Sequence, residues 1–280
     1  MKIDELPALA NTIRRDIIEM LVQAKSGHAA GPLGMAEVFT ALYFHVLRHD
    51  PQRPNWPDRD RLVLSNGHIC PVLYAAMARA GYFPISELKT YRQLGSRLQG
   101  HPSRLDLPGL ENSSGPLGQG YSQAVGMALA LKMEGRTAQV YCVSSDGEHD
   151  EGQVWEAAMA AAKYRLHNLA VIIDRNNIQI DGHTEDVMPL ESLRAKYEAF
   201  NWYVIEIDGH NIREIIEACE MAKAVFEKPV AIIARTIPGK GVDFMQWRPE
   251  WHGKAPTPAE AQKALRELRS LGGRVKRDED

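Results

Sequence analysis

The sequence has little cysteine and no long apolar segment. Its three cysteines, Cys70, Cys142 and Cys219, are far apart in a chain of 280 residues, which excludes a disulfide framework and a cysteine metal motif. Cys142 lies in an apolar run and is expected to be a small buried hydrophobic residue. No apolar run approaches the ~18 residues of a membrane span, and the acidic residues within 1–20 exclude a signal peptide. We therefore expect a soluble, cytoplasmic protein without a membrane partner.

The sequence also lacks a surplus of either charge. Lysine and arginine total 33 against 36 aspartates and glutamates, so the formal net charge is −3. No basic excess is available to neutralise phosphates, which excludes a dedicated nucleic-acid binder. Apolar residues make up 44% and charged residues 25%, as in ordinary globular proteins. With no repeat and no clear linker, the sequence favours a single domain over 1–272. The charged tail over 273–280 is typical of a natural terminus, with a cloned fragment as the alternative.

Apolar strand-like runs alternate with helical patterns along the chain. Strands are expected at 61–64, 138–143, 169–173, 203–207 and 230–234. Helices are expected at 8–24, 34–48, 71–80, 86–94, 121–134, 151–165, 211–226 and 258–270. Alternating strands and helices form parallel sheets, so we expect a three-layer α/β/α fold around a mainly parallel sheet. Residues 95–120 form a loop rich in glycine and proline, and a loop of this length is usually functional.

Two polar turns follow neighbouring predicted strands. Asp146 and Gly147 come directly after one strand, and Asn176 follows the next strand, 30 residues after Asp146. The ligand site of a parallel sheet lies beyond the carboxyl ends of its strands, so Asp146 and Asn176 should emerge side by side. Carboxylate, amide and main-chain oxygens suit Mg²⁺ or Ca²⁺ and leave positions for phosphate oxygens, while Gly147 permits close backbone approach. Two ordinary turns are the alternative, but their spacing favours a metal–diphosphate site.

Four histidines share a setting beside glycine or proline on predicted loops: His28, His68, His101 and His252. Histidine titrates near neutral pH, donates to phosphate or hydroxyl oxygens and moves protons. The four therefore suggest a polar pocket, although their spacing does not show that they converge. The remaining histidines lack this setting and are interpreted mostly as solvated or capping residues, with the last two left open: His45, His49, His149, His167, His183 and His210.

A glycine-rich segment over 112–130 places Gly115, Gly118 and Gly120 before a predicted helix. It is not a P-loop, because no Gly-Lys-Ser/Thr closes it, and not a dinucleotide fingerprint, because no strand clearly leads into it. Taken alone, it predicts only a loop whose backbone approaches a ligand ring or a partner.

Together these segments resemble the transketolase family from about residue 10 to residue 270. The resemblance is carried, in the family's order and spacing, by SGHAAGPLGMAE (26–37), DRLVLSNGH (60–68), GHP (100–102), GPLGQG (115–120), SDGEHDEGQVWEA (145–157), NNIQIDGH (176–183), DGHN (208–211) and WHGKAP (251–256). It implies the thiamine diphosphate-binding fold and, within it, the domain that binds the diphosphate end of thiamine diphosphate.

The resemblance also implies roles for individual residues. Asp146, Asn176 and the main-chain carbonyl of Ile178 resemble the protein ligands of Mg²⁺ or Ca²⁺. The implied cofactor contacts are Gly147, His68 and His252 at the diphosphate, Gly115 and Leu117 near the rings, and Ile180 packed against the cofactor. His28, His101 and His252 resemble the histidines that hold ketose hydroxyls and assist proton movement. Glu151 resembles the buried glutamate that couples the two active sites of the family's dimer.

Two departures from the family are visible. The family's metal turn usually begins with glycine, whereas Ser145 precedes Asp146 and Gly147 here. Transketolases also continue with a pyrimidine-binding domain and a C-terminal domain, which these 280 residues do not include. The resemblance therefore implies the N-terminal subunit of a split transketolase, which works with a separate C-terminal subunit in an α2β2 assembly. The pair would transfer a two-carbon ketol unit from a ketose phosphate to an aldose phosphate, by family default in the pentose phosphate pathway.

Three other functions stay open at this point. The α subunit of a 2-oxoacid dehydrogenase-type decarboxylase shares the metal turn and the split architecture, but is not expected to carry both GPLGQG and WHGKAP. The synthase that condenses pyruvate with glyceraldehyde phosphate has similar early motifs but is one long chain. A non-catalytic binding or regulatory module would be favoured by loss of the metal pair or the loop histidines, and both are present.

Overall fold

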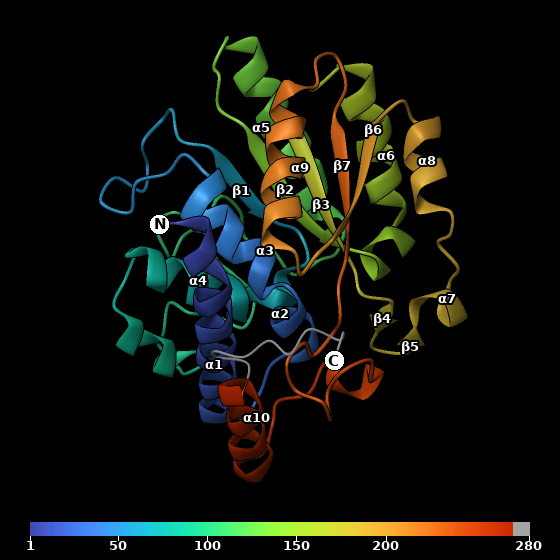
Figure 1. Ribbon diagram of the computed structural model, residues 1–280. Helices are drawn as coiled ribbons and strands as arrows, with labels where there is room; N and C mark the ends of the chain where they lie inside the picture. The colour runs from blue at the N-terminus through green and yellow to red at the C-terminus, as the bar shows by residue number, and fades with distance from the viewer. Residues whose placement is uncertain (271–280) are drawn as a thin grey trace.

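The centre of the protein is a five-stranded sheet in which every neighbouring pair of strands is parallel. The computed structural model describes residues 1–270, so the charged tail expected over 273–280 lies outside them. The strands lie in the order β1-β2-β3-β7-β6 (Figure 1). All five predicted strands are confirmed, with these bounds: β1 Arg61–Leu64, β2 Val140–Ser145, β3 Leu169–Arg175, β6 Tyr203–Asp208 and β7 Val230–Arg235.

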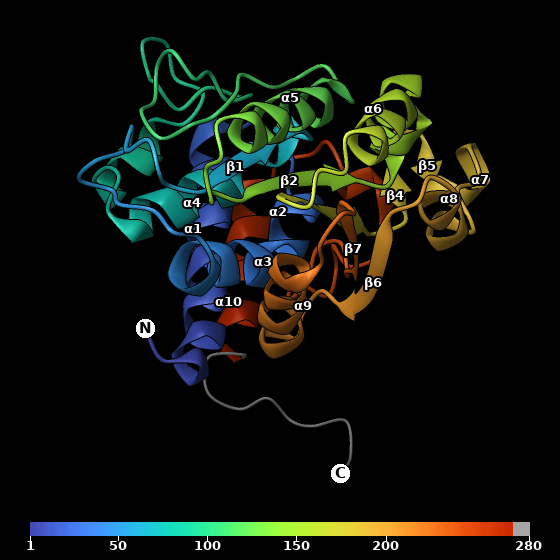
Figure 2. The same cartoon turned by 90° about the horizontal axis from the view of Figure 1, so that it is seen from above.

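Helices cover both faces of the sheet, as the view from above shows (Figure 2). One face carries α5 Gln119–Met133 and α6 Gly152–Lys163, and α8 Leu193–Ala199 packs into the same apolar cluster. The other face carries a larger set: α1 Leu6–Ala24, α2 Ala30–Gly34, α3 Ala36–Ala41, α4 Cys70–Ala80, α9 Ile212–Ala224 and α10 Pro258–Ser270. The expected helix, sheet and helix layers are therefore present.

The side chains of each central strand alternate between two apolar clusters. In β3, Leu169, Val171 and Ile173 pack against the α5 and α6 side, whereas Ala170 and Ile172 pack against the opposite side. Each aliphatic side chain so buried stabilises the fold by about 2 kcal/mol. Because both faces are covered, all of β3 is buried, which explains why the strand is a continuous apolar run in the sequence.

Two predicted helices are wrong in part. Residues 86–94 contain only a 3-10 helix over Ile85–Thr90, because Arg92 takes a positive φ of 59° that a right-handed helix excludes. The segment 34–48 is divided into α2, α3 and a π-helical turn over Leu42–Val46. At the first division the Gly34 backbone packs on a neighbouring loop, where an added Cβ would lie 3.0 Å from the Ile237 carbonyl oxygen.

Several short elements that the sequence analysis missed lie between β3 and β6. They are α8, the four-residue α7 Thr184–Val187, and the strands β4 Ile178–Gln179 and β5 Gly182–His183, which pair with each other in antiparallel fashion. Elements of two to four residues are too short to show a period in the sequence.

The carboxyl ends of β1, β2 and β3 lie at one edge of the sheet, because these strands are parallel neighbours. The long loop that precedes α5 has no helix or strand over residues 92–118, as predicted. Within the described residues, none of the helices has the length and apolar character that a bilayer crossing requires.

Candidate functional site

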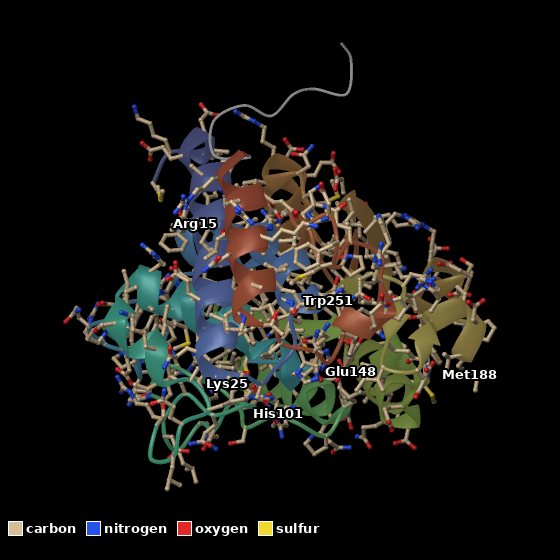
Figure 3. All side chains as sticks on the ribbon, turned by 90° about the horizontal axis from the view of Figure 1, so that it is seen from below. Arg15, Lys25, His101, Glu148, Met188 and Trp251 are labelled. Atoms are coloured by element: carbon tan, nitrogen blue, oxygen red, sulfur yellow. The ribbon has the colours of Figure 1, made fainter. Side chains whose placement is uncertain are left out.

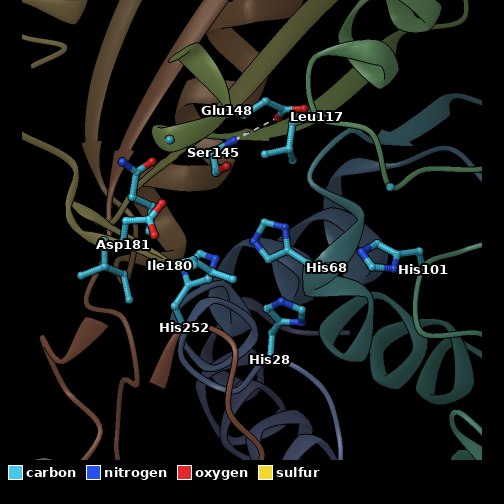
Figure 4. Close-up of a pocket in the computed structure, with 13 residues that line it drawn as sticks. His28, His68, His101, Leu117, Ser145, Glu148, Ile180, Asp181 and His252 are labelled. Carbon is cyan, nitrogen blue, oxygen red and sulfur yellow. Dashed lines mark hydrogen bonds between the residues drawn. The ribbon is translucent and has the colours of Figure 1, made fainter. Parts of the chain in front are cut away.

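A cavity of about 350 Å³ opens beyond the carboxyl ends of the central strands, within the range of small-molecule sites. It brings together nine predicted residues, namely His28, His68, His101, Gly115, Leu117, Gly147, Ile178, Ile180 and His252 (Figure 4). Four residues that the sequence analysis did not single out also line it: Ser145, Glu148, Gln179 and Asp181. The site is thus built from the segments that the motifs marked.

The four loop histidines converge in this cavity (Figure 4). The ring centroid of His28 lies 5.0 Å from that of His68, 6.4 Å from that of His101 and 5.8 Å from that of His252. The His68 and His252 centroids are 5.0 Å apart. Residues distant in sequence therefore form one cluster, which spacing alone did not establish.

Burial keeps these histidines uncharged near neutral pH. Burial lowers the pKa of His28 and of His252 to about 4, with a further lowering of the His28 pKa by His252, Arg92 and His101. The pKa of His68 is lowered for the same main reason, followed by the effects of its histidine neighbours. Neutral imidazoles each offer one hydrogen-bond donor and one acceptor.

The histidine cluster has polar atoms ready for a ligand. Within the described chain, Nδ1 of His28 and Nδ1 of His252 are buried without a hydrogen-bond partner, an arrangement that costs free energy unless a ligand or water satisfies them. No group of three histidine, cysteine or acidic residues among 1–270 could hold a metal ion, so the histidines are not a metal centre. They suit hydroxyl and phosphate oxygens instead.

Asp146 and Asn176 emerge from neighbouring strands, as predicted. Ser145 at the end of β2 is in register with Asp174 in β3, and the Asp146 amide donates to the Asp174 carbonyl at 3.1 Å. The buried Asp146 carboxylate accepts from the Gly147 amide at 2.8 Å and from the Asn177 amide at 2.5 Å. Its position is therefore fixed by the turn in which it lies.

The donor set fits a hard divalent cation. The Asn176 amide nitrogen donates to Asp174 at 2.7 Å, and its oxygen accepts from the Ile178 amide at 3.0 Å, which fixes the oxygen end of the side chain. Asp146, Asn176 and the Ile178 carbonyl thus offer oxygen ligands of three kinds. Gly147 lines the cavity, and a Cβ there would lie 2.7 Å from Gln179 Oε1, so glycine leaves room for a phosphate.

Arg175 is a charged partner of this turn that the sequence analysis missed. Its guanidinium donates to Asp146 at 2.9 Å, and it also pairs with Glu185 and Glu191 at 2.5 and 3.0 Å. Arg175 therefore links the turn after β2 to the segment that contains α7. An arginine at the end of a predicted strand gave no sequence signal for this contact.

Glu148 is the second residue that sequence reasoning missed. Its side chain is fully buried and accepts from Ser65 Oγ at 2.5 Å, from the Gly118 amide at 2.7 Å and from Ser144 Oγ at 2.8 Å. One carboxylate therefore joins the end of β1, the glycine-rich loop and the end of β2. In the view from below, Glu148 and His101 both lie toward the middle of the molecule (Figure 3).

Two expectations about side chains near the turn need correction. Glu151 was expected to be buried, but its side chain is exposed in the single chain, where the residue precedes α6; its coupling role stays a prediction. His149 was grouped with the solvated or capping histidines, but it is buried, with ring nitrogens 2.7 Å from the Ser145 carbonyl and from Tyr197 Oη. The turn thus rests on a buried hydrogen-bonded layer.

Along nearly its whole length the chain is similar to known proteins. The family described as "Transketolase, thiamine diphosphate binding domain" matches residues 7–272. A 6-deoxy-6-sulfo-D-fructose transketolase subunit from Clostridium sp. is 45% identical, over 96% of this chain and 98% of that protein. One of the two subunits of an apulose-4-phosphate transketolase from Phocaeicola vulgatus is 40% identical, over 96% of this chain and 95% of that protein.

Solved transketolase structures contain the same fold as one part of a longer chain. Transketolase from Campylobacter jejuni matches with a TM-score of 0.90 and 36% identity, over 96% of this chain and 43% of that chain. Transketolase from Leishmania mexicana matches with a TM-score of 0.89 and 35% identity, over 94% of this chain and 41% of that chain. The present chain spans less than half the length of these proteins.

Proposed function

The chain belongs to the transketolase family, and we propose that it is the N-terminal subunit of a split, two-subunit transketolase. The extent of the match carries this proposal. The chain covers 98% and 95% of two relatives that are each named a transketolase subunit, but only 43% of the Homo sapiens transketolase. These end-to-end matches favour a split transketolase over a 2-oxoacid dehydrogenase subunit or a non-catalytic module.

The cofactor of the proposed reaction is thiamine diphosphate with Mg²⁺ or Ca²⁺. When bound, thiamine diphosphate supplies the carbanion chemistry of ketol transfer. In this chain Asp146, Asn176 and the Ile178 carbonyl would hold the metal ion. Gly147, His68 and His252 would contact the diphosphate, and the cavity residues near the rings would be Gly115, Leu117 and Ile180.

His28, His101 and His252 would bind the hydroxyls of the sugar and move protons at their ring nitrogens. Support comes from their convergence in one cavity and from the unpartnered Nδ1 atoms of His28 and His252. We propose a ketose phosphate as donor and an aldose phosphate as acceptor. The named relatives are transketolase subunits for 6-deoxy-6-sulfo-D-fructose and apulose-4-phosphate.

The proposed partner is a C-terminal subunit that carries the pyrimidine-binding and C-terminal domains, in an α2β2 assembly in which Glu151 couples the active sites. Support comes from the word "subunit" in the names of the relatives and from the exposure of Glu151, which leaves it available to another chain. We place the enzyme in the cytoplasm, since all three cysteines are buried and free, as is usual in a reducing compartment.

The test is cofactor binding followed by ketol transfer. We expect calorimetry to show Mg²⁺-dependent binding of thiamine diphosphate, lost in Asp146→Ala and kept in the control Asp186→Ala, whose side chain is exposed. The chain mixed with a C-terminal subunit from a neighbouring gene should then transfer a two-carbon unit between sugar phosphates. Unchanged affinity in a folded Asp146→Ala protein would refute the metal site, and an inactive mixture with bound cofactor would refute the reaction.

A further inference from the structure

Arg92 lies between the two loops that carry His28 and His101. Its Nη1 donates to Ser26 Oγ at 2.7 Å, two residues before His28. Its Nη2 donates to the Gly100 carbonyl, directly before His101, at 3.5 Å. A Cβ added to Gly100 would lie 2.6 Å from Arg92 Nε, so the guanidinium rests on the backbone of that loop.

The two histidine loops have no direct connection of their own. Among residues 1–270, no hydrogen bond runs directly between segments 25–29 and 99–102, and the His28 and His101 ring centroids are 6.4 Å apart. Neither histidine lies within a helix or strand. The separation of the two rings must therefore be set by whatever holds the loops together.

We propose that Arg92 is a positioning residue whose guanidinium ties the His28 loop to the His101 loop and so sets the spacing of the two histidines. The inference rests on the proposed function, because the roles of both histidines come from it.

The neighbour of Arg92 supports the same arrangement. Tyr91 is fully buried, and its hydroxyl accepts from Arg92 Nε at 3.1 Å. The same hydroxyl would lie 3.2 Å from a Cβ added to Gly27, the residue before His28. The pair Tyr91 and Arg92 thus fills the space between the two loops, which explains why the chain leaves the helical conformation at this point.

Arg92 also supplies a permanent positive charge beside two of the four histidines. After burial and His252, it lowers the pKa of His28, and after burial it lowers the pKa of His101. The lowered pKa values of His68 and His252 arise from burial and, for His68, from the other histidines. The groups that face His28 are the other three histidines and Arg92, with Tyr91 and Cys70 behind the arginine. Charge and hydrogen-bonding fork can therefore be tested separately.

The first test is an NMR titration of histidine-labelled full chain without cofactor, with resonances assigned by single histidine substitutions. Removal of the charge in Arg92→Met should raise the pKa of His28 and His101 and leave those of His68 and His252 in place. Arg92→Lys keeps the charge and should hold all four near the wild-type values. The control is Arg97→Met, on the same loop, where Arg97 pairs with Glu87 at 2.6 Å and none of the four pKa values should move. Unmoved His28 and His101 in Arg92→Met, or an equal change of all four, would overturn the proposal.

The second test is steady-state ketol transfer with the partner subunit. Both Arg92→Lys and Arg92→Met lose the planar fork, so both should raise the KM for the ketose by about tenfold, as expected for a lost charge-assisted hydrogen bond. The Kd for thiamine diphosphate should stay within about twofold, because Arg92 contacts none of the predicted cofactor residues. An unchanged KM in Arg92→Lys would refute the positioning role. An inactive wild-type pair would refute the proposed function and leave the titration standing.

Discussion

The buried carboxylate of Glu148 provides a sharp test of how the cavity is held open. Glu148→Ala removes the acceptor for Ser65 Oγ, the Gly118 amide and Ser144 Oγ. The two hydroxyls can rotate toward other acceptors, but the Gly118 amide has a fixed direction and loses its partner. The glycine-rich loop is then no longer tied to the ends of β1 and β2.

The magnitude follows from these contacts. An orphaned buried donor costs about 1–3 kcal/mol, and the lost packing of the side-chain methylene adds about 1 kcal/mol, so we expect a destabilisation of about 3 kcal/mol. For a chain of this size that corresponds to a fall in Tm of about 6 °C. Glu148→Gln should cost about 1 kcal/mol, because the amide oxygen still accepts from Ser65 and Gly118 while the amide nitrogen can donate to Ser144.

The assay is urea and thermal unfolding without cofactor, compared with Glu156→Ala on the exposed side of α6. The expected order of stability is wild type, then Glu156→Ala and Glu148→Gln, with Glu148→Ala clearly the lowest. If Glu148→Ala is as stable as Glu156→Ala, the carboxylate does not hold the three segments together.

Two further predictions concern pH and the glycine turn. The pKa of His28 and of His252 is lowered by burial from 6.5 to about 4, so the unfolded chain binds more protons between these values and the free energy of unfolding should decline as pH falls from 6.5 toward 4. Urea titrations at pH 7 and pH 5 check this, and a His28→Asn, His252→Asn double variant with the same pH dependence as wild type would contradict it. In Gly147→Ala the new Cβ meets only the flexible end of Gln179, so Tm should stay within about 2 °C while the Kd for thiamine diphosphate rises by about tenfold or more; weak loss of affinity in calorimetry would argue against a phosphate at this turn.

The central sheet was predictable because its strands are buried on both faces. A run such as 169–173 is apolar at every position, and neighbouring runs of this kind place their carboxyl ends together. The adjacency of Asp146 and Asn176 followed from that rule alone. The convergence of the four histidines did not follow, since it depends on loops whose paths are set by contacts far apart in sequence.

The missed residues share one property, which is that their partners are distant in sequence. Glu148 bonds Ser65 across 83 residues, and Arg175 bonds Asp146 across 29. A carboxylate in a polar turn and an arginine at a strand end are both ordinary surface patterns in sequence. Only the closure of the sheet buries Glu148 and surrounds Arg175 with acids. The failed helix at 86–94 has the same origin, because Tyr91 and Arg92 serve tertiary contacts that a helix would break.

The most direct measurement of the central claim is ketol-transfer activity as a function of subunit ratio. The total protein concentration is held constant, and the chain and its C-terminal partner are mixed in varying proportions with thiamine diphosphate and Mg²⁺. A split transketolase predicts negligible activity for either chain alone and a maximum at an equimolar ratio. Full activity of this chain alone, or no activity at any ratio although the cofactor binds, would contradict the account.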